Sequence, residues 1–572
     1  MNPPTYLGSQ SGSCHVLTPQ LRKNQGTMFC RRAIFLQVLI GLGALWMLSG
    51  SLQAATIWNG SGGTGGDGNW STGADWSAGV PTTLEDARFQ VDGTLTTAAA
   101  EIDLTGPQEV KVLTVGEGKS VTLNMADGAS LAASGNSNVG NLSLGTGTGP
   151  ANLTIEGPGT GSATYSHIRI DVFNNSSMVV AGNVTGTGTG DSSIGRGAAA
   201  QGSSSLSVLD GANISFATLA VGRGSSDNFL LASGAGSSFT TSSGLSVGTS
   251  SGSANVGNSA RAENGGQIIV TALGALGQGV GDHSNYFEVT GSNSVLTIDT
   301  LRVGDQTASP RNIGGNYLRI ASGGTAKMDG DIDINSYDDS STNFGSNYVL
   351  VDAGGTLTHS RTDVRNKGLL QLASGGAIEG RDLAGTPLNS VITVDSGGRF
   401  EAAGAGLGAD TTVRTTVESG AAFSVGLGDA VAASTLTLSN SDSWLRLESG
   451  STFEIGLFGV NLNDTLQLDA ADAFVVLSGV TVKLTLQGYV PVDGNSWSIV
   501  SGLSSGFSSG SDANFAAATF DLPALSGGLS WDTTNFSSVG GWEVSVVPEP
   551  STFLLVGVSL CGLLISRRRK HS

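Results

Sequence analysis

Apolar and polar residues alternate along most of this 572-residue chain, in short runs separated by glycine. Val391-Ile-Thr-Val394 and Leu445-Arg-Leu447 are typical of these runs. A period of two places alternate side chains on opposite faces of a β-strand. No stretch between Thr56 and Val547 shows the period of a helix. The pattern therefore predicts an all-β protein.

Three short cassettes recur along the same region. The first is a strand end, two small or acidic residues and a glycine, at Met125–Gly128, Val208–Gly211, Leu231–Gly234, Ile320–Gly323, Val351–Gly354, Leu372–Gly375, Val394–Gly397, Val417–Gly420 and Leu447–Gly450. The second ends a strand in glycine, at Leu113–Gly116, Leu142–Gly145, Leu219–Gly222, Leu245–Gly248 and Leu301–Gly304. The third is asparagine before an aromatic residue, at Asn228, Asn285, Asn316 and Asn347. Glycine supplies the positive φ that tight corners need.

Repeats of roughly 20 to 50 residues are typical of solenoids. From Gly323 the first cassette recurs after 31, 21, 22, 23 and 30 residues. We therefore predict a right-handed parallel β-helix (a solenoid) of about 14 coils, which at ~4.8 Å per coil would be about 65–70 Å long. A row of antiparallel β-sandwich modules is the competing architecture.

The beginning of the chain resembles a secretory leader. Arg31 and Arg32 precede the apolar run Ala33–Leu48 and a stretch of small residues, the three parts of a signal peptide. We predict a signal peptide over residues 28–55, with cleavage after Ala54 or Ala55. Met28 is then the natural start, and residues 1–27 are a gene-model extension.

The end of the chain combines a Pro-Glu-Pro sequence, an apolar run and a basic cluster. Residues 551–566 are uncharged, which predicts one short transmembrane helix with its basic end in the cytoplasm. The proposed sorting motif is Val547, Pro548, Glu549 and Pro550, and the membrane stop cluster is Arg567, Arg568, Arg569 and Lys570.

These three parts, in this order, resemble the PEP-CTERM sorting tail of exported bacterial proteins. The resemblance implies export by the Sec machinery and processing by exosortase, a membrane protease-transpeptidase. It also implies a transient anchor in the inner membrane and a final place on the cell surface or in the extracellular matrix. The tryptophan-rich segment 56–92 and the block before the tail are similar to autotransporter-like β-helix proteins with the same tail, which implies a passenger-like architecture rather than an activity.

The similarities and the repeats divide the chain into six segments. We predict the leader described above and, after it, an N-terminal cap that contains Trp58, Trp70 and Trp76. A repeat region follows, and then a β-rich cap with longer strands and more aromatic residues. The predicted boundaries are 1–27, 28–55, 56–99 (N-terminal cap), 100–452 (β-helix repeats), 453–546 (C-terminal β-rich region) and 547–572 (sorting tail).

The charge of the chain limits the kinds of partner it can bind, and its cysteine content limits the ways in which it can be stabilised. The chain has 46 acidic and 27 basic residues, and part of the basic residues lies in the leader and the tail, so the exported body is strongly acidic. Such a surface argues against nucleic acid or anionic membranes as partners. Cys14, Cys30 and Cys561 all lie in the leader or the tail, so the body has no disulfide. Its stability must come from size and repetition.

Candidate chemistry is sparse, and no cofactor is predicted. Asp331 and Asp333 would share one face of a strand, where two carboxylates can bind calcium or act as acid and base. We favour a plain solvated turn there. His167, His283 and His359 are far apart in sequence, and we expect all three to be exposed. The segment 62–70 imitates one calcium-binding nonapeptide, but a single copy predicts a glycine-rich loop.

Two classes of function follow. The first is an exported, non-catalytic structural or adhesive protein of the cell surface or extracellular matrix, which presents a long face to exopolysaccharide or neighbouring cells. The second is a polysaccharide-acting enzyme on a β-helix scaffold. Ice binding is a weaker alternative, because the sequence lacks a Thr-x-Thr array. We predict the first class.

Overall fold

The computed structural model describes residues 55–58, 67–89, 99–116, 118–139, 150–196, 202–249, 255–278, 282–304, 314–335, 346–428, 430–440, 442–469, 474–476, 479–502, 518–537, 542–549 and 561. The predicted gene-model extension, nearly all of the predicted signal peptide, Pro550, the basic cluster and the predicted transmembrane segment apart from Cys561 lie outside these residues. Among the described residues, no helix has the length and hydrophobicity needed to cross a membrane.

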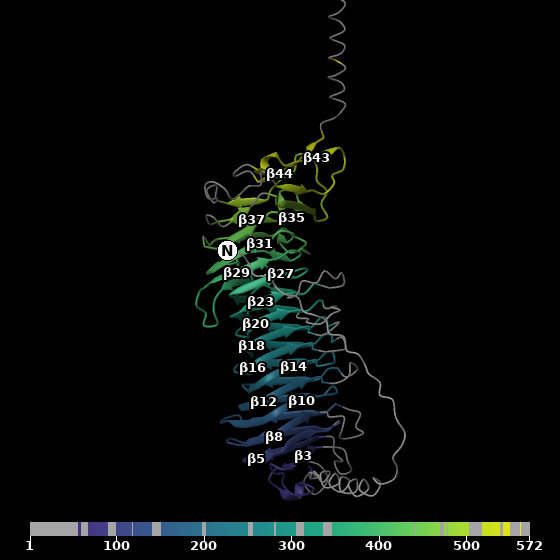
Figure 1. The fold of residues 1–572 in the computed structure, drawn as a ribbon, viewed down its shortest axis with the longest axis vertical. Helices are drawn as coiled ribbons and strands as arrows, with labels where there is room; N and C mark the ends of the chain where they lie inside the picture. Colours follow the sequence, from purple (N-terminus) through teal and green to yellow (C-terminus); the bar gives the residue numbers. More distant parts are fainter. Residues whose placement is uncertain are drawn as a thin grey trace, which may run out of the picture. The chain divides into compact units, whose positions relative to one another are not determined.

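The body is a parallel β-helix in which strands of successive coils stack on one another (Figure 1). One sheet, called here the short-strand sheet, contains β2 (Gly68–Asn69), β4 (Ala99–Leu104), β7 (Ser120–Met125), β9 (Asn152–Glu156), β11 (Ser177–Ala181), β13 (Ser205–Leu209), β15 (Phe229–Ser233), β17 (Ser259–Glu263), β19 (Tyr286–Thr290), β21 (Tyr317–Ala321), β24 (Tyr348–Val351), β27 (Leu369–Leu372), β30 (Arg399–Ala402), β32 (Ala422–Val425), β35 (Thr452–Gly459), β36 (Leu462–Asn463), β39 (Thr481–Leu486) and β42 (Thr519–Asp521).

The second sheet, called here the long-strand sheet, covers the other side of each coil. It contains β1 (Ala55–Ile57), β3 (Asp86–Phe89), β5 (Pro107–Val110), β6 (Val112–Val115), β8 (Ser130–Val139), β10 (Ala163–Val172), β12 (Val184–Ile194), β14 (Asn213–Val221), β16 (Ser238–Val247), β18 (Gln267–Leu276), β20 (Val295–Val303), β22 (Thr325–Met328), β23 (Asp331–Ile334), β25 (Thr356–His359), β26 (Arg361–Val364), β28 (Ala377–Gly380), β29 (Asn389–Val394), β31 (Thr412–Val417), β34 (Trp444–Leu447) and β38 (Phe474–Val476). Many of its strands shift register in the middle, and from β22 the two halves are separate strands.

Two small sheets complete the C-terminal part. One is parallel and contains β33 (Thr435–Leu438), β37 (Thr465–Leu468) and β41 (Val500–Gly502). The other is antiparallel, with β44 (Glu543–Pro548) between β40 (Ser496–Ser498) and β43 (Leu529–Asp532). We call this antiparallel sheet the C-terminal cap. Short 3-10 helices occur at Gly73–Asp75 (η2) and Thr534–Ser537 (η5).

The stacking confirms the predicted parallel β-helix and excludes the sandwich modules. From β4 to β35 the described residues place 14 strands of the short-strand sheet in one parallel ladder, one strand per coil. Parallel pairing also continues on both sides of the predicted repeat region, from β1 with β3 and from β39 with β42. The solenoid therefore extends into segments that the sequence suggested were caps.

The period of two explains the core. In β15, Leu230 and Ala232 are fully buried, whereas the alternate residues of the strand face outward. Because the register is parallel, like side chains lie above like, as where Phe400, Phe423 and Phe453 stack with ring centroids 5.5 and 6.2 Å apart. Burial of such side chains from coil to coil is the main source of stability in a solenoid without disulfides.

The first cassette marks two different corners of the coil. The first corner leads from the short-strand sheet to the long-strand sheet, and Gly354 lies there, between β24 and β25. The second corner leads back, and Gly397 lies there, between β29 and β30. The interval of 22 residues from Gly375 to Gly397 therefore crosses from one corner to the other and is not a coil. The same sequence pattern, ending in glycine, occurs at both corners. Counting the repeats along the sequence therefore does not show which corner each one belongs to.

Candidate functional site

The predicted sorting motif begins inside the folded body. Val547 and Pro548 are the last two residues of β44, and Glu549 follows the strand directly. Val546 is fully buried, Val547 is half-buried, and Pro548 and Glu549 are exposed. The structure thus places three of the four predicted motif residues at the rim of the C-terminal cap. Pro550 and the cluster Arg567–Lys570 lie outside the described residues.

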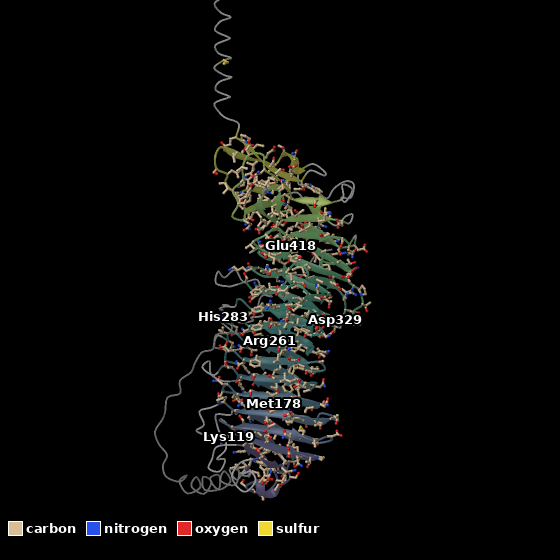
Figure 2. All side chains as sticks on the ribbon, turned by 180° about the vertical axis from the view of Figure 1, so that it is seen from behind. Lys119, Met178, Arg261, His283, Asp329 and Glu418 are labelled. Atoms are coloured by element: carbon tan, nitrogen blue, oxygen red, sulfur yellow. The ribbon has the colours of Figure 1, made fainter. Side chains whose placement is uncertain are left out.

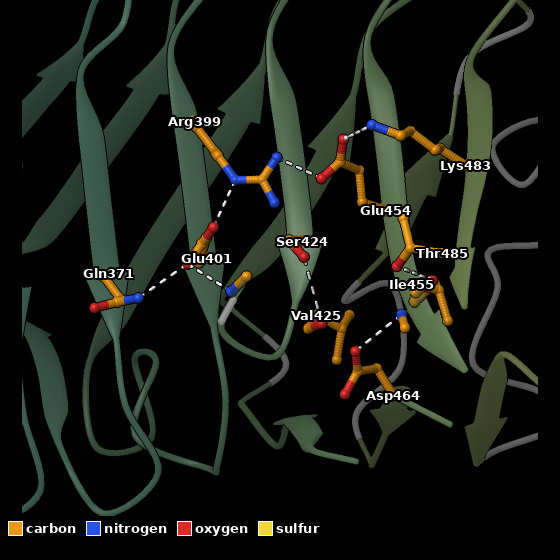
Figure 3. A network of polar contacts seen from close by, with 12 residues as sticks. Gln371, Arg399, Glu401, Ser424, Val425, Glu454, Ile455, Asp464, Lys483 and Thr485 are labelled. Carbon is orange, nitrogen blue, oxygen red and sulfur yellow. Dashed lines mark hydrogen bonds and ion pairs between the residues drawn. The ribbon is translucent and has the colours of Figure 1, made fainter. Parts of the chain in front are cut away.

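A ladder of charged side chains covers the outer face of the short-strand sheet near the C-terminal end (Figure 3). Arg399 on β30 donates to Glu401 at 2.6 Å and also contacts Glu454 on β35. Lys483 on β39 forms an ion pair with the other oxygen of Glu454 at 3.0 Å. Gln371 on β27 donates to Glu401 at 2.9 Å. Glu401 and Glu454 are therefore already paired with residues that lie between β27 and β39.

A second charged ladder runs along the same sheet in earlier coils. Arg261 bonds both Glu263 (2.9 Å) and Glu288 (3.0 Å), one coil further on. Arg319 links Glu288 (3.3 Å) to Asp352 (2.7 Å). Cations and carboxylates thus alternate along the stack, which neutralises the local charge on an otherwise acidic body.

The acidic candidates Asp331 and Asp333 share one face of β23, as predicted, because Ile332 and Ile334 between and beside them are buried. The surroundings differ from those of a calcium site. Asp333 pairs with Arg365 at 3.2 Å and lies 3.9 Å from Arg302.

Asp331 lies in register with Arg361 on the next strand, and Asp333 lies in register with Asp363. Burial raises the pKa of Asp333, and the charge of Arg365 opposes that shift. No group of three or more potential metal ligands occurs among the described residues. Arg365 and Arg302 face the Asp333 carboxylate, so this oxygen donor already has cationic side chains beside it.

The histidine prediction is wrong for two of the three residues. His283 is exposed, and in Figure 2 it lies on the opposite edge of the stack from Asp329. His167 and His359 point into the core, where burial lowers the pKa of each imidazole to about 4. Both are therefore neutral at pH 7. They occupy inward positions in phase with apolar neighbours such as Leu357, and this phase was the sequence signal that we missed.

The packing of both buried histidines is structural. The His167 ring lies between Tyr165 and Phe216, with centroid distances of 5.1 and 5.0 Å. His359 Nδ1 is 3.0 Å from the hydroxyl of Thr362. Neither ring faces an acidic partner in the described residues, so the arrangement offers no proton-transfer pair.

The asparagine cassette has a structural role that the sequence did not reveal. Each asparagine is buried at the second corner, whereas the aromatic residue after it faces outward. The outward rings stack in parallel, Tyr286 on Tyr317 at 4.9 Å and Tyr317 on Tyr348 at 5.0 Å. Burial raises the pKa of Tyr317 to about 12, so its hydroxyl stays protonated at neutral pH.

The nonapeptide-like segment is only partly described. Asp67 accepts a hydrogen bond from the backbone N–H of Glu101 at 2.9 Å, which ties the loop to β4. Trp70 packs with Trp76 at 4.9 Å and with Phe89 at 6.2 Å. This end of the solenoid is thus closed by an aromatic cluster, and residues 62–66 lie outside the described part.

The comparisons with known proteins assign the tail. Residues 546–570 match the model of the PEP-CTERM protein-sorting motif, which indicates an exported cell-surface protein and processing by exosortase. No curated protein sequence matches this chain. Among solved structures, the chain is similar to a crystal structure of the TibC-catalysed, hyper-glycosylated TibA fragment. The identity is 13%, the coverage is 80% of this chain and 100% of that chain, and the TM-score is 0.31. These values are too low to support a functional argument.

Proposed function

We propose that this protein is a non-catalytic structural or adhesive component of the cell surface or extracellular matrix. Export begins with the N-terminal leader, and a short C-terminal helix holds the precursor in the inner membrane until exosortase removes the tail. The mature chain then presents the outer faces of its coils to exopolysaccharide or to neighbouring cells.

One observation supports this proposal above the others: the sorting motif is joined to a solenoid on which arginine side chains pair with carboxylates of neighbouring strands. Arg365 contacts Asp333, and Arg399 contacts Glu401 and Glu454. A glycosidase needs a raised-pKa acid and a second free carboxylate at a defined separation. Paired carboxylates that follow one another along the stack favour a stable, charge-balanced face over a reacting centre.

A fractionation experiment tests the route. The full chain is expressed in a host with exosortase and in a matched host without it, and the membrane, surface and medium fractions are separated. We expect the mature chain at the surface only where exosortase is present, and the uncleaved precursor in the membrane fraction elsewhere. Truncation after Glu549, which leaves β44 whole, should release the body into the periplasm or medium. An identical distribution of all three forms would contradict the proposal.

A turnover assay separates the structural role from the enzymatic alternative. The purified mature chain is incubated with a panel of acidic and neutral polysaccharides, and new reducing ends and unsaturated products are measured. We expect retention on some of these polymers without products. Catalytic turnover that persists in Asp331→Asn and Asp333→Asn would place the reaction elsewhere on the coils, and turnover lost in both would identify these carboxylates as an active site.

A further inference from the structure

The last strand of the body and the sorting motif overlap. β44 runs from Glu543 to Pro548, whereas the match to the sorting motif begins at residue 546. β44 is the middle strand of the C-terminal cap, with β40 on one side and β43 on the other. A middle strand cannot leave its sheet without breaking hydrogen bonds on both edges. The start of the motif is therefore a structural part of the cap.

Backbone hydrogen bonds continue through the overlap to its last described residue. The Val546 N–H donates to the carbonyl of Asn495 at 2.9 Å, and the Val546 carbonyl accepts from Gly494 at 3.0 Å. On the other edge, Val546 pairs with Trp531. Beyond the strand, the Glu549 N–H still donates to the carbonyl of Gly528 at 2.8 Å.

Side-chain burial adds a second restraint on the same strand. Val544 and Val546 are fully buried, and Trp542 is nearly so. They belong to the hydrophobic core at this end of the solenoid, with Trp497 and Trp531 packed close by at 5.7 Å between ring centroids. Exposure begins only at Pro548. The boundary between shielded and accessible backbone thus falls within the Pro-Glu-Pro sequence.

We propose that the C-terminal cap sets the processing boundary: it shields the peptide bonds up to Pro548–Glu549 and confines cleavage to bonds after Glu549. A protease binds several extended residues through free backbone N–H and C=O groups, and β44 has already used these groups within its own sheet. This inference rests on the proposed processing of the tail by exosortase.

The chemical step is an acyl transfer at one peptide bond beyond the cap. The C–N bond on the C-terminal side of Glu549 or of a later residue breaks, and its carbonyl carbon is transferred to water or to an amine acceptor. The nitrogen that leaves with the tail takes up a proton. The mature chain then keeps β44 whole between β40 and β43, so release from the membrane exposes no new sheet edge on the body.

A matched pair of variants tests the boundary. Val544→Lys places a charge in the buried face of β44, and Ser545→Lys places the same charge on its partly exposed face, opposite Asp532. Both positions precede the matched motif, so the motif itself is unchanged. The full precursors are expressed with exosortase, and the C-terminus of each mature chain is determined by mass spectrometry. We expect the native chain and Ser545→Lys to end at Glu549 or a later residue, and Val544→Lys to gain additional ends within 543–548.

A second measurement keeps the inference independent of exosortase. Purified native precursor is digested briefly with proteinase K, and the first cuts are mapped. We expect them beyond Glu549 and not within β44. Early cuts within β44, or a native mature chain that ends before Glu549, would overturn the inference. A tail that persists in cells, together with the expected proteinase K map, would instead overturn the proposed processing and leave the shielding in place.

Discussion

The coils from β15 to β24 and the coils from β27 to β39 use the same two sheets but close the second corner differently. In the first group, a loop runs from a glycine to a buried asparagine, and its length varies. Gly222 precedes Asn228 by six residues, whereas Gly304 precedes Asn316 by twelve. In the second group, the corner is a short turn such as the one around Gly397.

Different groups hold the two kinds of corner together. In the first group, Asn258 Nδ2 donates to Asn285 Oδ1 (2.9 Å), and Asn285 Nδ2 donates to Asn316 Oδ1 (3.0 Å). In the second group, main-chain hydrogen bonds join successive corners. The Gly397 N–H donates to the Gly420 carbonyl, and the Gly420 N–H donates to the Gly450 carbonyl, both at 2.9 Å. A ladder of side-chain hydrogen bonds thus keeps successive coils in register where the loops differ in length. A main-chain ladder suffices where every turn is short and alike.

The largest expected effect comes from breaking the asparagine ladder. Asn285→Ala removes the oxygen that accepts from both the backbone N–H (3.1 Å) and Nδ2 (2.9 Å) of Asn258. These buried donors would have no partner, and each costs about 1–3 kcal/mol, so we expect a local loss of about 4 kcal/mol. Hydrogen exchange of peptides from β17 and β19 measures it, because a solenoid opens locally.

Asn213→Ala is the matched control for this substitution. Asn213 is exposed and makes one local hydrogen bond, to Gly211 at 3.0 Å. We expect a change below about 0.5 kcal/mol there. If the two variants exchanged at equal rates, the buried ladder would not be what registers these coils.

Glycine substitutions at equivalent corners give the next largest difference. A Cβ on Gly248 would lie 2.5 Å from the Asn285 amide, which its ladder bonds hold in place. A Cβ on Gly450 would meet the free end of the Ser419 side chain, also at 2.5 Å, which can rotate away. Both residues have positive φ, 73° and 83°, and pay about 1–2 kcal/mol for that conformation in alanine variants.

We therefore expect Gly248→Ala to cost about 3 kcal/mol and Gly450→Ala about 1–2 kcal/mol. Thermal unfolding with hydrogen exchange as a local readout compares the two. Equal losses in both glycine variants would mean that backbone strain alone, without the ladder, decides the cost.

The sequence predicted the coils but not how the corners lock. Alternation of apolar and polar residues identifies a strand because the pattern lies within the strand itself, with every second side chain facing the core. Gly248 and Asn285 lie against each other although they are 37 residues apart in the sequence. The sequence around either residue therefore does not reveal that the two are in contact. Asn258 escaped notice because Ser259, not an aromatic residue, follows it. In the same way, the letters of the sorting motif were readable, but its overlap with β44 was not, because the C-terminal cap is built from non-repeating aromatic residues.

The second group of coils also contains a buried carboxyl group, Asp464. At one place near the C-terminal end of the second group, the side chain of Asp464 bonds the main chain: its oxygens accept from Ser434 N–H (2.8 Å) and Gly456 N–H (2.9 Å) beside the positive-φ Gly426. Burial raises the pKa of this carboxyl to about 6, although the two N–H groups oppose the shift.

The folded state therefore keeps a proton on Asp464 at pH values where the unfolded chain has lost it. Its contribution to stability is complete below the ordinary value near 3.8 and is lost as the pH rises through about 6. We expect a decrease of about 2–3 kcal/mol between pH 4 and pH 7 in the coils around β35 and β37. Hydrogen exchange corrected for intrinsic rates measures it, and Asp464→Asn should remove the slope. An identical slope in the coils around the neutral Asn285 would contradict the assignment.

The smallest expected effect compares the charged ladders of the two groups. The side chains of Glu401 and Glu454 beside Arg399 are 7% and 11% exposed, whereas that of Asp352 beside Arg319 is 33% exposed. Arg399→Met leaves two poorly solvated carboxylates with Lys483, Gln371 and the Gly428 N–H as their remaining partners, so we expect a loss of about 1–2 kcal/mol. Arg319→Met should cost less than about 0.5 kcal/mol, because water solvates Asp352 and Arg261 still pairs with Glu288. Urea unfolding of both variants in low and high salt tests this difference. The Arg319 effect should disappear at high salt, and the Arg399 effect should persist, since a buried charge without its partner is poorly screened.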